Sequence, residues 1–216
     1  MSMFSDLFKE YESLVEKADQ AFLEVQGLHG SCIRCREGCS DCCNSVFGLF
    51  PIEAAYLSHH FGRLGRKVRR EAGVRGEKAG RELQEVQQRL AAYDHNPGEK
   101  GLAMARERVR CPLLNKDEKC DLYQRRPITC RVYGIPAVIS GRLHACWKAG
   151  FEKGKPYPAF NLDAAYRELY GLSQRIMQRC GVKDPERAGL LLSVPMAIKT
   201  PAEELFKATE DMMREE

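Results

Sequence analysis

Residues 32–43 read CIRCREGCSDCC and hold five cysteines: Cys32, Cys35, Cys39, Cys42 and Cys43. A chain of 216 residues can bury an apolar core without covalent or metal cross-links, so packing alone does not require so dense a run of sulfur. The run therefore indicates a chemical role, and metal binding is the role that we expect.

A second block of cysteines lies further along the chain, between residues 111 and 146. It contributes four more thiols: Cys111, Cys120, Cys130 and Cys146. Nine of the ten cysteines therefore fall in two blocks. Thiolates from two distant stretches can meet at a metal only if folding brings them together, so we expect metal binding and folding to be coupled.

The two blocks share a set of short motifs with a known family. The motifs are Cys35-x3-Cys39-x2-Cys42-Cys43, Cys111-Pro112-Leu113-Leu114, Cys120-Asp121-Leu122-Tyr123, Arg126-Pro127, Cys130-Arg131 and Cys146. Over residues 32–150 the chain resembles the cysteine-cluster zinc- or iron-chelating domains, a family to which flagellin lysine N-methylases also belong. Much of that family has two residues in the first gap where this chain has three, and Cys32 is an additional upstream thiol.

The resemblance implies which thiols bind the metal. The predicted ligands are Cys35, Cys39, Cys42, Cys43, Cys111, Cys120, Cys130 and Cys146. Eight thiols suffice for two sites with four ligands each, and they equally allow one cluster together with structural sulfurs. The grouping of the ligands, and whether Cys32 is among them, stays open at this point.

Both zinc and a 4Fe-4S iron–sulfur cluster suit these ligands. Zinc accepts four cysteines in tetrahedral geometry, and iron–sulfur clusters are also held by four cysteine thiolates. Soft sulfur ligands alone do not choose between the two metals. The resemblance to flagellin N-methylases implies an iron–sulfur cluster and S-adenosylmethionine, which favours iron.

Three functions are compatible with this pattern. The first is an iron–sulfur protein that modifies a protein substrate, such as by methyl transfer to lysine; no glycine-rich loop between a strand and a helix marks a nucleotide-like site. The second is a zinc-stabilised, non-catalytic interaction module. The third is redox sensing or metal handling, which requires labile metal and reactive thiols.

Composition limits the class of protein. No stretch of about eighteen apolar residues is present, and the first residues form an amphipathic pattern, so we expect neither a membrane span nor a signal peptide but a cytoplasmic protein. Thiols stay reduced in that compartment, which favours metal ligands over disulfides. The formal net charge of +4 is too small to indicate nucleic acid, so any macromolecular partner is expected to be a protein.

The predicted fold is mainly α-helical with small β-hairpins, and an irregular cysteine-rich core is packed among the helices. We expect one domain over residues 1–216, in which the metal-binding core of residues 32–150 carries helical additions at both ends. The expected helices cover residues 4–25, capped by Ser5 and ended by Gly27 or Gly30, then 51–61, 67–93 and 162–180, with a short helix starting at Pro127. Residues 94–101 are expected to form a loop, 102–109 a short helix, and 111–120 and 137–146 two hairpins.

Three further residues stand near the predicted ligands. Arg126 and Arg131 could offset the charge of a thiolate site, or could be surface residues. Tyr123 could be a core aromatic residue, a hydrogen-bond donor to sulfur or a catalytic group, and a core aromatic residue is the commonest of these. Because neighbouring side chains normally diverge, we expect one thiol of the Cys42-Cys43 pair to face a second metal, a second iron or the core.

Basic residues cluster between Arg63 and Arg89, where nine lysines and arginines stand against four glutamates. A solvated helix face accounts for this pattern, and a docking surface for an acidic partner or RNA is the alternative.

Overall fold

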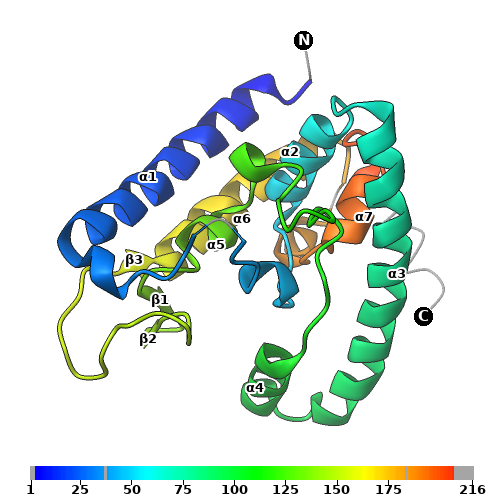
Figure 1. The fold of residues 1–216 in the computed structure, drawn as a ribbon. Helices are drawn as coiled ribbons and strands as arrows, with labels where there is room; N and C mark the ends of the chain where they lie inside the picture. The colour runs from blue at the N-terminus through cyan, green and yellow to red at the C-terminus, as the bar shows by residue number, and fades with distance from the viewer. Residues whose placement is uncertain (1–2, 37, 183, 207–216) are drawn as a thin grey trace. The chain divides into compact units, whose positions relative to one another are not determined.

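The computed structural model describes residues 3–36, 38–182 and 184–206, and this part of the chain is mainly helical, as predicted (Figure 1). Its α-helices are α1 (Ser5–His29), α2 (Pro51–Phe61), α3 (Arg66–Leu90), α4 (Pro97–Arg106), α5 (Ile128–Val132), α6 (Leu162–Arg179) and α7 (Val194–Lys199). Its strands are β1 (Ala137–Ile139), β2 (Arg142–His144) and β3 (Phe160–Asn161), and short 3-10 turns include η2 (Cys42–Asn44) and η5 (Pro185–Gly189). The cysteines are spread among these elements.

The chain divides into two compact units. Unit 1 consists of residues 1–39, 50–53 and 126–190, and unit 2 of residues 40–49, 54–125 and 191–216. The chain therefore enters and leaves each unit more than once, and helix α2 begins in unit 1 and continues in unit 2. The single-domain organisation stays a prediction.

Unit 1 is built on the antiparallel pair α1 and α6, which run side by side (Figure 1). Three ion pairs join them in opposite sequence order: Asp6 to Arg179, Glu10 to Arg175 and Lys17 to Glu168. Beneath these pairs the helices bury apolar stripes with three- and four-residue spacing, as predicted for both segments. Phe4, not Ser5, stands at the N-cap position of α1, so the predicted cap is wrong.

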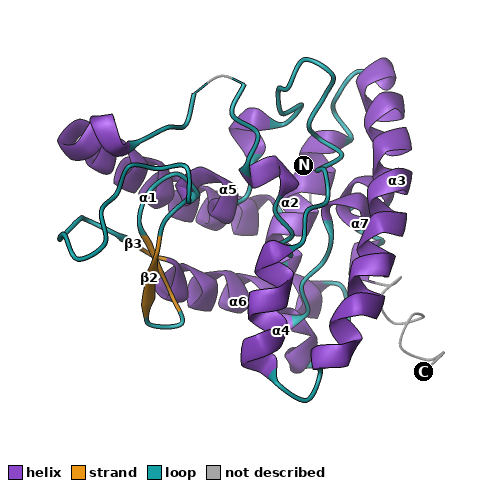
Figure 2. Cartoon of the chain, turned by 60° about the horizontal axis from the view of Figure 1, so that its bottom comes forward, coloured by secondary structure: helices purple, strands orange, loops and turns teal. Residues whose placement is uncertain are grey.

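A small sheet completes unit 1 (Figure 2). Strands β1 and β2 form the predicted antiparallel hairpin, and β3 pairs with β1 in parallel. Ser140 and Gly141 turn the hairpin with positive φ angles of 52° and 69°. Two consecutive residues in the left-handed region match the twist of a tight hairpin, which is why a Ser-Gly turn was informative in the sequence.

Glu53 lies fully inside unit 1, at the start of α2. Its Oε1 accepts a hydrogen bond from the Ile128 N–H at 3.0 Å, its Oε2 accepts one from the Phe50 N–H at 3.2 Å, and the Tyr11 hydroxyl also bonds to it. The carboxyl thus satisfies backbone donors at the starts of α2 and α5. Burial, which outweighs these hydrogen bonds, raises the pKa of Glu53 to about 7.

Unit 2 is built on the long helix α3, which packs against the short helix α7. Its three interior glycines do not interrupt it, and the predicted helix over residues 67–93 is confirmed, with a 3-10 turn over Ala91–Tyr93. Gly76 has a packing role in α3. A Cβ atom at this position would stand 3.2 Å from Ile198 Cδ1 of α7, so the glycine allows close approach of the two helices.

Helix α4 corrects the sequence prediction for residues 94–109. The segment expected to be a loop already contains the start of α4 at Pro97, and the helix ends at Arg106. Asn96 caps it, since its side-chain oxygen accepts hydrogen bonds from the N–H groups of Gly98 and Glu99, both at 3.2 Å. A proline in the first helical position fits the same arrangement.

No helix in the described part of the chain has the length and apolar character needed to cross a membrane. The location in the cytoplasm stays a prediction.

Candidate metal centre

The eight predicted ligands divide equally between the two units. Unit 1 holds Cys35, Cys39, Cys130 and Cys146, and unit 2 holds Cys42, Cys43, Cys111 and Cys120. The remaining cysteines, Cys32 and Cys180, both belong to unit 1. Cys35 is exposed and the other predicted ligands are half-buried.

In unit 2, two separate segments pair through their backbones. The Cys111 N–H donates to the Cys43 carbonyl at 2.7 Å, and the Val109 N–H donates to the Asn44 carbonyl at 3.1 Å. An antiparallel bridge between Ser45 and Arg108 extends this pairing. Residues Cys42 and Cys43, in the η2 turn, are thereby held beside Cys111 although the sequence separates them widely.

A tight hairpin adds the fourth thiol of unit 2. Leu114 and Cys120 form an antiparallel bridge, as expected for residues 111–120, and the Asp121 N–H donates to the Leu113 carbonyl at 2.8 Å. The Asn115 side-chain oxygen accepts hydrogen bonds from two N–H groups within the turn. Cys120 is thus returned to the neighbourhood of Cys111.

Helix α3 fixes this hairpin from outside. Arg75 donates from Nε to the Pro112 carbonyl and from Nη2 to Asp121 Oδ2, both at 2.7 Å, while the other Asp121 oxygen accepts from the Asn115 amide at 3.0 Å. We did not identify this clamp from the sequence. Asp121 directly follows a ligand and Arg75 lies in the basic run, but the pattern carries no signal that joins them.

The sulfur atoms of unit 2 lie close together. The Cys42 and Cys43 Sγ atoms are 4.0 Å apart, so these neighbouring side chains do not diverge, and the expectation that one of them faces a second metal, a second iron or the core stays a prediction. Burial, with a smaller contribution from the nearby Cys120 and Cys42 thiols, raises the pKa of the Cys111 thiol to about 12. Four soft donors thus share one partly desolvated neighbourhood.

In unit 1, Cys35 packs against the chain that follows α5. A Cβ atom at the buried Gly134 would overlap the Cys35 Sγ, so this thiol occupies the space beside the glycine backbone. Helix α5, which ends just before Gly134, carries Cys130 and begins after Pro127 as predicted. Cys35 and the segment that carries Cys130 therefore adjoin.

The segment around Cys146 reaches the same region. The Gly150 N–H donates to the Cys32 carbonyl at 2.7 Å, and the Ala149 N–H donates to the Cys146 carbonyl at 2.9 Å. A cavity of about 490 Å³ opens here, and its lining residues are Ile33, Arg34, Cys35, Arg36, Gly38, Cys39 and Lys148. Three cations thus stand around two of the predicted ligands.

Arg131, Tyr123 and Cys180 differ in how deeply they are buried. Arg131 is buried and its guanidinium donates to Asp19 of α1 at 2.6 Å and to the Arg126 carbonyl at 2.9 Å, so it ties α5 to α1. Tyr123 is 58% exposed, and the prediction that it is a core aromatic residue is wrong. Cys180 forms the C-cap of α6 and is half-buried.

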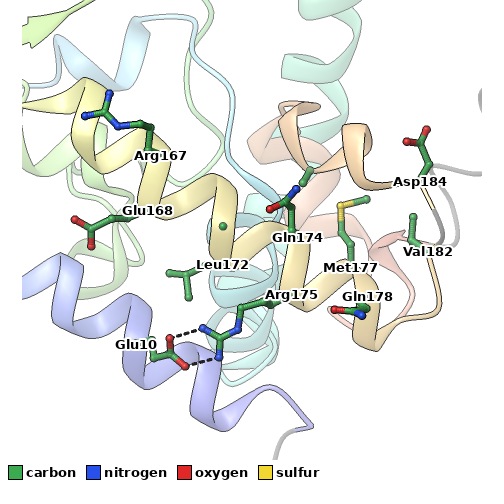
Figure 3. A pocket seen from close by; sticks show the side chains of 12 residues that line it. Glu10, Arg167, Glu168, Leu172, Gln174, Arg175, Met177, Gln178, Val182 and Asp184 are labelled. Atoms are coloured by element: carbon green, nitrogen blue, oxygen red, sulfur yellow. Dashed lines mark hydrogen bonds and ion pairs between the residues drawn. The ribbon is translucent and has the colours of Figure 1, made fainter.

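Unit 1 has a second and larger cavity, of about 770 Å³, between α1 and α6 (Figure 3). Glu10 of α1 lines it, together with one face of α6 and residues Val182, Asp184 and Ala188. Glu10 accepts two hydrogen bonds from Arg175, at 2.5 and 2.6 Å. Its lining contains no thiol, which separates this cavity from the predicted ligands.

The four thiols of unit 2 lie near one another, but they do not form a finished coordination shell. Within residues 3–36, 38–182 and 184–206, no three His, Cys, Asp or Glu side chains are positioned to hold a metal ion. The donor sets nevertheless fit zinc or iron chemically, because each unit contains four of the predicted thiol ligands, the ligand number and type that both metals take from cysteine. The list of ligands stays a prediction.

Comparison with known proteins gave one match. The family model CxxCxxCC, described as "putative zinc- or iron-chelating domain", matches residues 34–146, which is more than half of the chain. Neither the curated proteins nor the solved structures contain a match.

Proposed function

Because this chain belongs to the CxxCxxCC family of zinc- or iron-chelating domains, we propose that it binds metal through cysteine thiolates and that unit 2 uses them to hold zinc as a structural cross-link. One observation carries the choice of metal: the 4.0 Å separation of the Cys42 and Cys43 sulfurs, beside Cys111 and Cys120. The function is then that of a metal-stabilised interaction module.

The sulfur separation favours zinc for this set of ligands. Four thiolates at about 2.3 Å from a tetrahedral zinc stand about 3.8 Å from one another, close to the distance between Cys42 and Cys43. In a 4Fe-4S cluster each cysteine binds a different iron, so the cluster itself holds the ligand sulfurs apart. The geometry supports zinc, whereas the resemblance to flagellin methylases favoured iron.

The residues of unit 2 can prepare such a site. The backbone pairing of Cys43 with Cys111 and the hairpin at Cys120 bring the donors together before any ion binds. The clamp from Arg75 to Asp121 holds that hairpin against α3. Zinc would supply the positive charge that stabilises four thiolates, and its binding would release their protons.

An iron–sulfur protein that takes part in protein modification, such as lysine methylation, is the second candidate. The resemblance to flagellin lysine N-methylases supports it, and so does the cavity beside Cys35 and Cys39, because a catalytic metal needs an open position. The protein substrate would approach from that exposed side of unit 1.

Metal and sulfide analysis of protein purified without air tests the proposal. We expect colourless protein with stoichiometric zinc that is retained through gel filtration. Brown protein with matching iron and sulfide, bleached by dithionite, would replace zinc with the second candidate. Protein that retains neither metal under these conditions would overturn both.

A further inference from the structure

We propose that the eight predicted ligands form two separate metal sites, one within each unit, which differ in how readily they exchange their metal. This inference rests on the proposed function, since it concerns how the same thiols are grouped. The unit 2 site is formed by Cys42, Cys43, Cys111 and Cys120, and the unit 1 site by Cys35, Cys39, Cys130 and Cys146. Each site would take one thiophilic divalent ion.

The division of the chain supports this grouping. The boundary between the units falls after Cys39, inside the first cysteine run, and a second boundary falls after Arg125, inside the second block. Each cysteine block is therefore divided once, and each unit receives two predicted ligands from each block. Four cysteines complete a tetrahedral shell, so neither unit lacks a ligand.

Contacts inside unit 2 join the segments that carry all four of its thiols. Cys42 and Cys43 have adjacent sulfurs, Cys43 is hydrogen-bonded to Cys111 through the backbone, and the Leu114–Cys120 bridge closes the hairpin. The Arg75 and Asp121 pair holds this hairpin, and Asp121 has only 9% of its side chain exposed. Because this arrangement is partly buried and held by the ion pair, we expect a chelator to remove metal from this site slowly.

Contacts inside unit 1 bring together the segments that carry the other four thiols, beside an open cavity. Cys35 lies against Gly134 just after the helix of Cys130, and Lys148, two residues after Cys146, lines the same cavity as Cys35 and Cys39. Cys35 is exposed, and the cavity admits small molecules. Metal bound at this site is therefore expected to exchange faster.

The first measurement is the metal content of the full-length protein and of two double variants. We expect two equivalents per chain in the wild type, and one equivalent each in Cys111→Ser/Cys120→Ser and in Cys130→Ser/Cys146→Ser. Cys180→Ser, outside both predicted ligand sets, should keep two. Circular dichroism checks that each variant retains its helices.

A second measurement does not depend on variants that fold. The wild type is treated with a chelator, and exposed thiols are alkylated at intervals and mapped by mass spectrometry. We expect two phases of metal release, with labelling of Cys35, Cys39, Cys130 and Cys146 in the fast phase and of the unit 2 thiols in the slow phase.

The outcomes separate this inference from the proposed function. Wild-type protein without any retained metal would overturn both. A single equivalent that is lost from either double variant, or labelling of all eight thiols in one phase, would leave metal binding intact and overturn the two-site grouping.

Discussion

Arg75 and Asp121 form a partly buried ion pair in which Nη2 lies 2.7 Å from Oδ2, although one residue belongs to a long helix and the other to a hairpin. Because the same guanidinium also bonds the Pro112 carbonyl, it contacts both sides of the Cys111–Cys120 segment. One arginine of a run that looks uniformly solvated thus has a specific structural role, which makes it a sensitive point for the unit 2 thiols.

We expect Arg75→Ala to lower the free energy of unfolding by about 2–3 kcal/mol. The reason is that the mostly buried Asp121 carboxylate loses its ion-pair partner and has little contact with water. Urea unfolding followed by circular dichroism measures the change. Arg81→Ala, an exposed arginine of the same helix, is the control and should change stability by less than about 0.5 kcal/mol. Equal effects of the two variants would contradict the role of the clamp.

The buried carboxyl group of Glu53 should make the stability of the folded protein depend on pH. Its pKa is raised from 4.5 to about 7 by burial, so the folded state binds the proton more tightly than the unfolded state. The sign follows: its contribution is fully present below about pH 4.5, falls as pH rises through the folded pKa, and is lost above about pH 7. The loss across this window is about 3 kcal/mol.

Substitution of Glu53 tests that dependence. Glu53→Gln cannot ionise, so we expect the difference in unfolding free energy between about pH 5 and pH 8 to shrink, although the variant loses one acceptor for the Phe50 or Ile128 N–H. The exposed Glu24→Gln should keep the wild-type profile. Parallel pH profiles for Glu53→Gln and the wild type would show that this carboxyl is not the source.

Gly134→Ala should disturb Cys35. The added methyl group overlaps the thiol, so we expect a loss of about 1–3 kcal/mol and a change in the alkylation rate of Cys35, measured by mass spectrometry. Adding Cys35→Ala should restore stability, because the Cys35 Cβ lies at an ordinary 3.5 Å from the new atom. In α6, Gly171→Ala meets no atom within 4 Å and should stabilise the helix slightly.

Asn96→Ala should weaken α4. The variant removes the acceptor for two N–H groups at the first turn, which costs about 1 kcal/mol, and thermal unfolding measures it. Asn96→Ser retains a capping oxygen and should recover most of the loss. A wild-type melting temperature in Asn96→Ala would show that the cap contributes little.

Local chemistry explains which parts of the fold the sequence predicts. Pro51 and Pro127 fix helix starts, and Ser140-Gly141 fixes a hairpin, because in each place one or two residues restrict the backbone directly. The start of α4 was missed for the opposite reason. Glycines beside Pro97 suggested a loop, while the capping residue Asn96 carried the information.

The sequence likewise predicts one part of the candidate site and not the other. Which cysteines are candidate ligands can be predicted from the sequence, because clustered cysteines at short spacings are typical of metal sites. Their grouping cannot, because it depends on where the chain passes from one unit to the other and on backbone pairing such as that of Cys43 with Cys111. Arg131 likewise stands beside a ligand in sequence but bonds to Asp19 in a distant helix.

The antiparallel pair α1 and α6 lies outside residues 34–146, the part of the chain that defines its family. These two helices nevertheless provide most of the buried wall of unit 1, and α1 supplies Tyr11 to Glu53 and Asp19 to Arg131. A fragment trimmed to the family boundaries would therefore carry every predicted ligand and still lack the scaffold of unit 1. Expression of residues 34–146 alone should therefore give an incompletely folded unit 1, and transfer of the motif to another protein would require α1 and α6 as well.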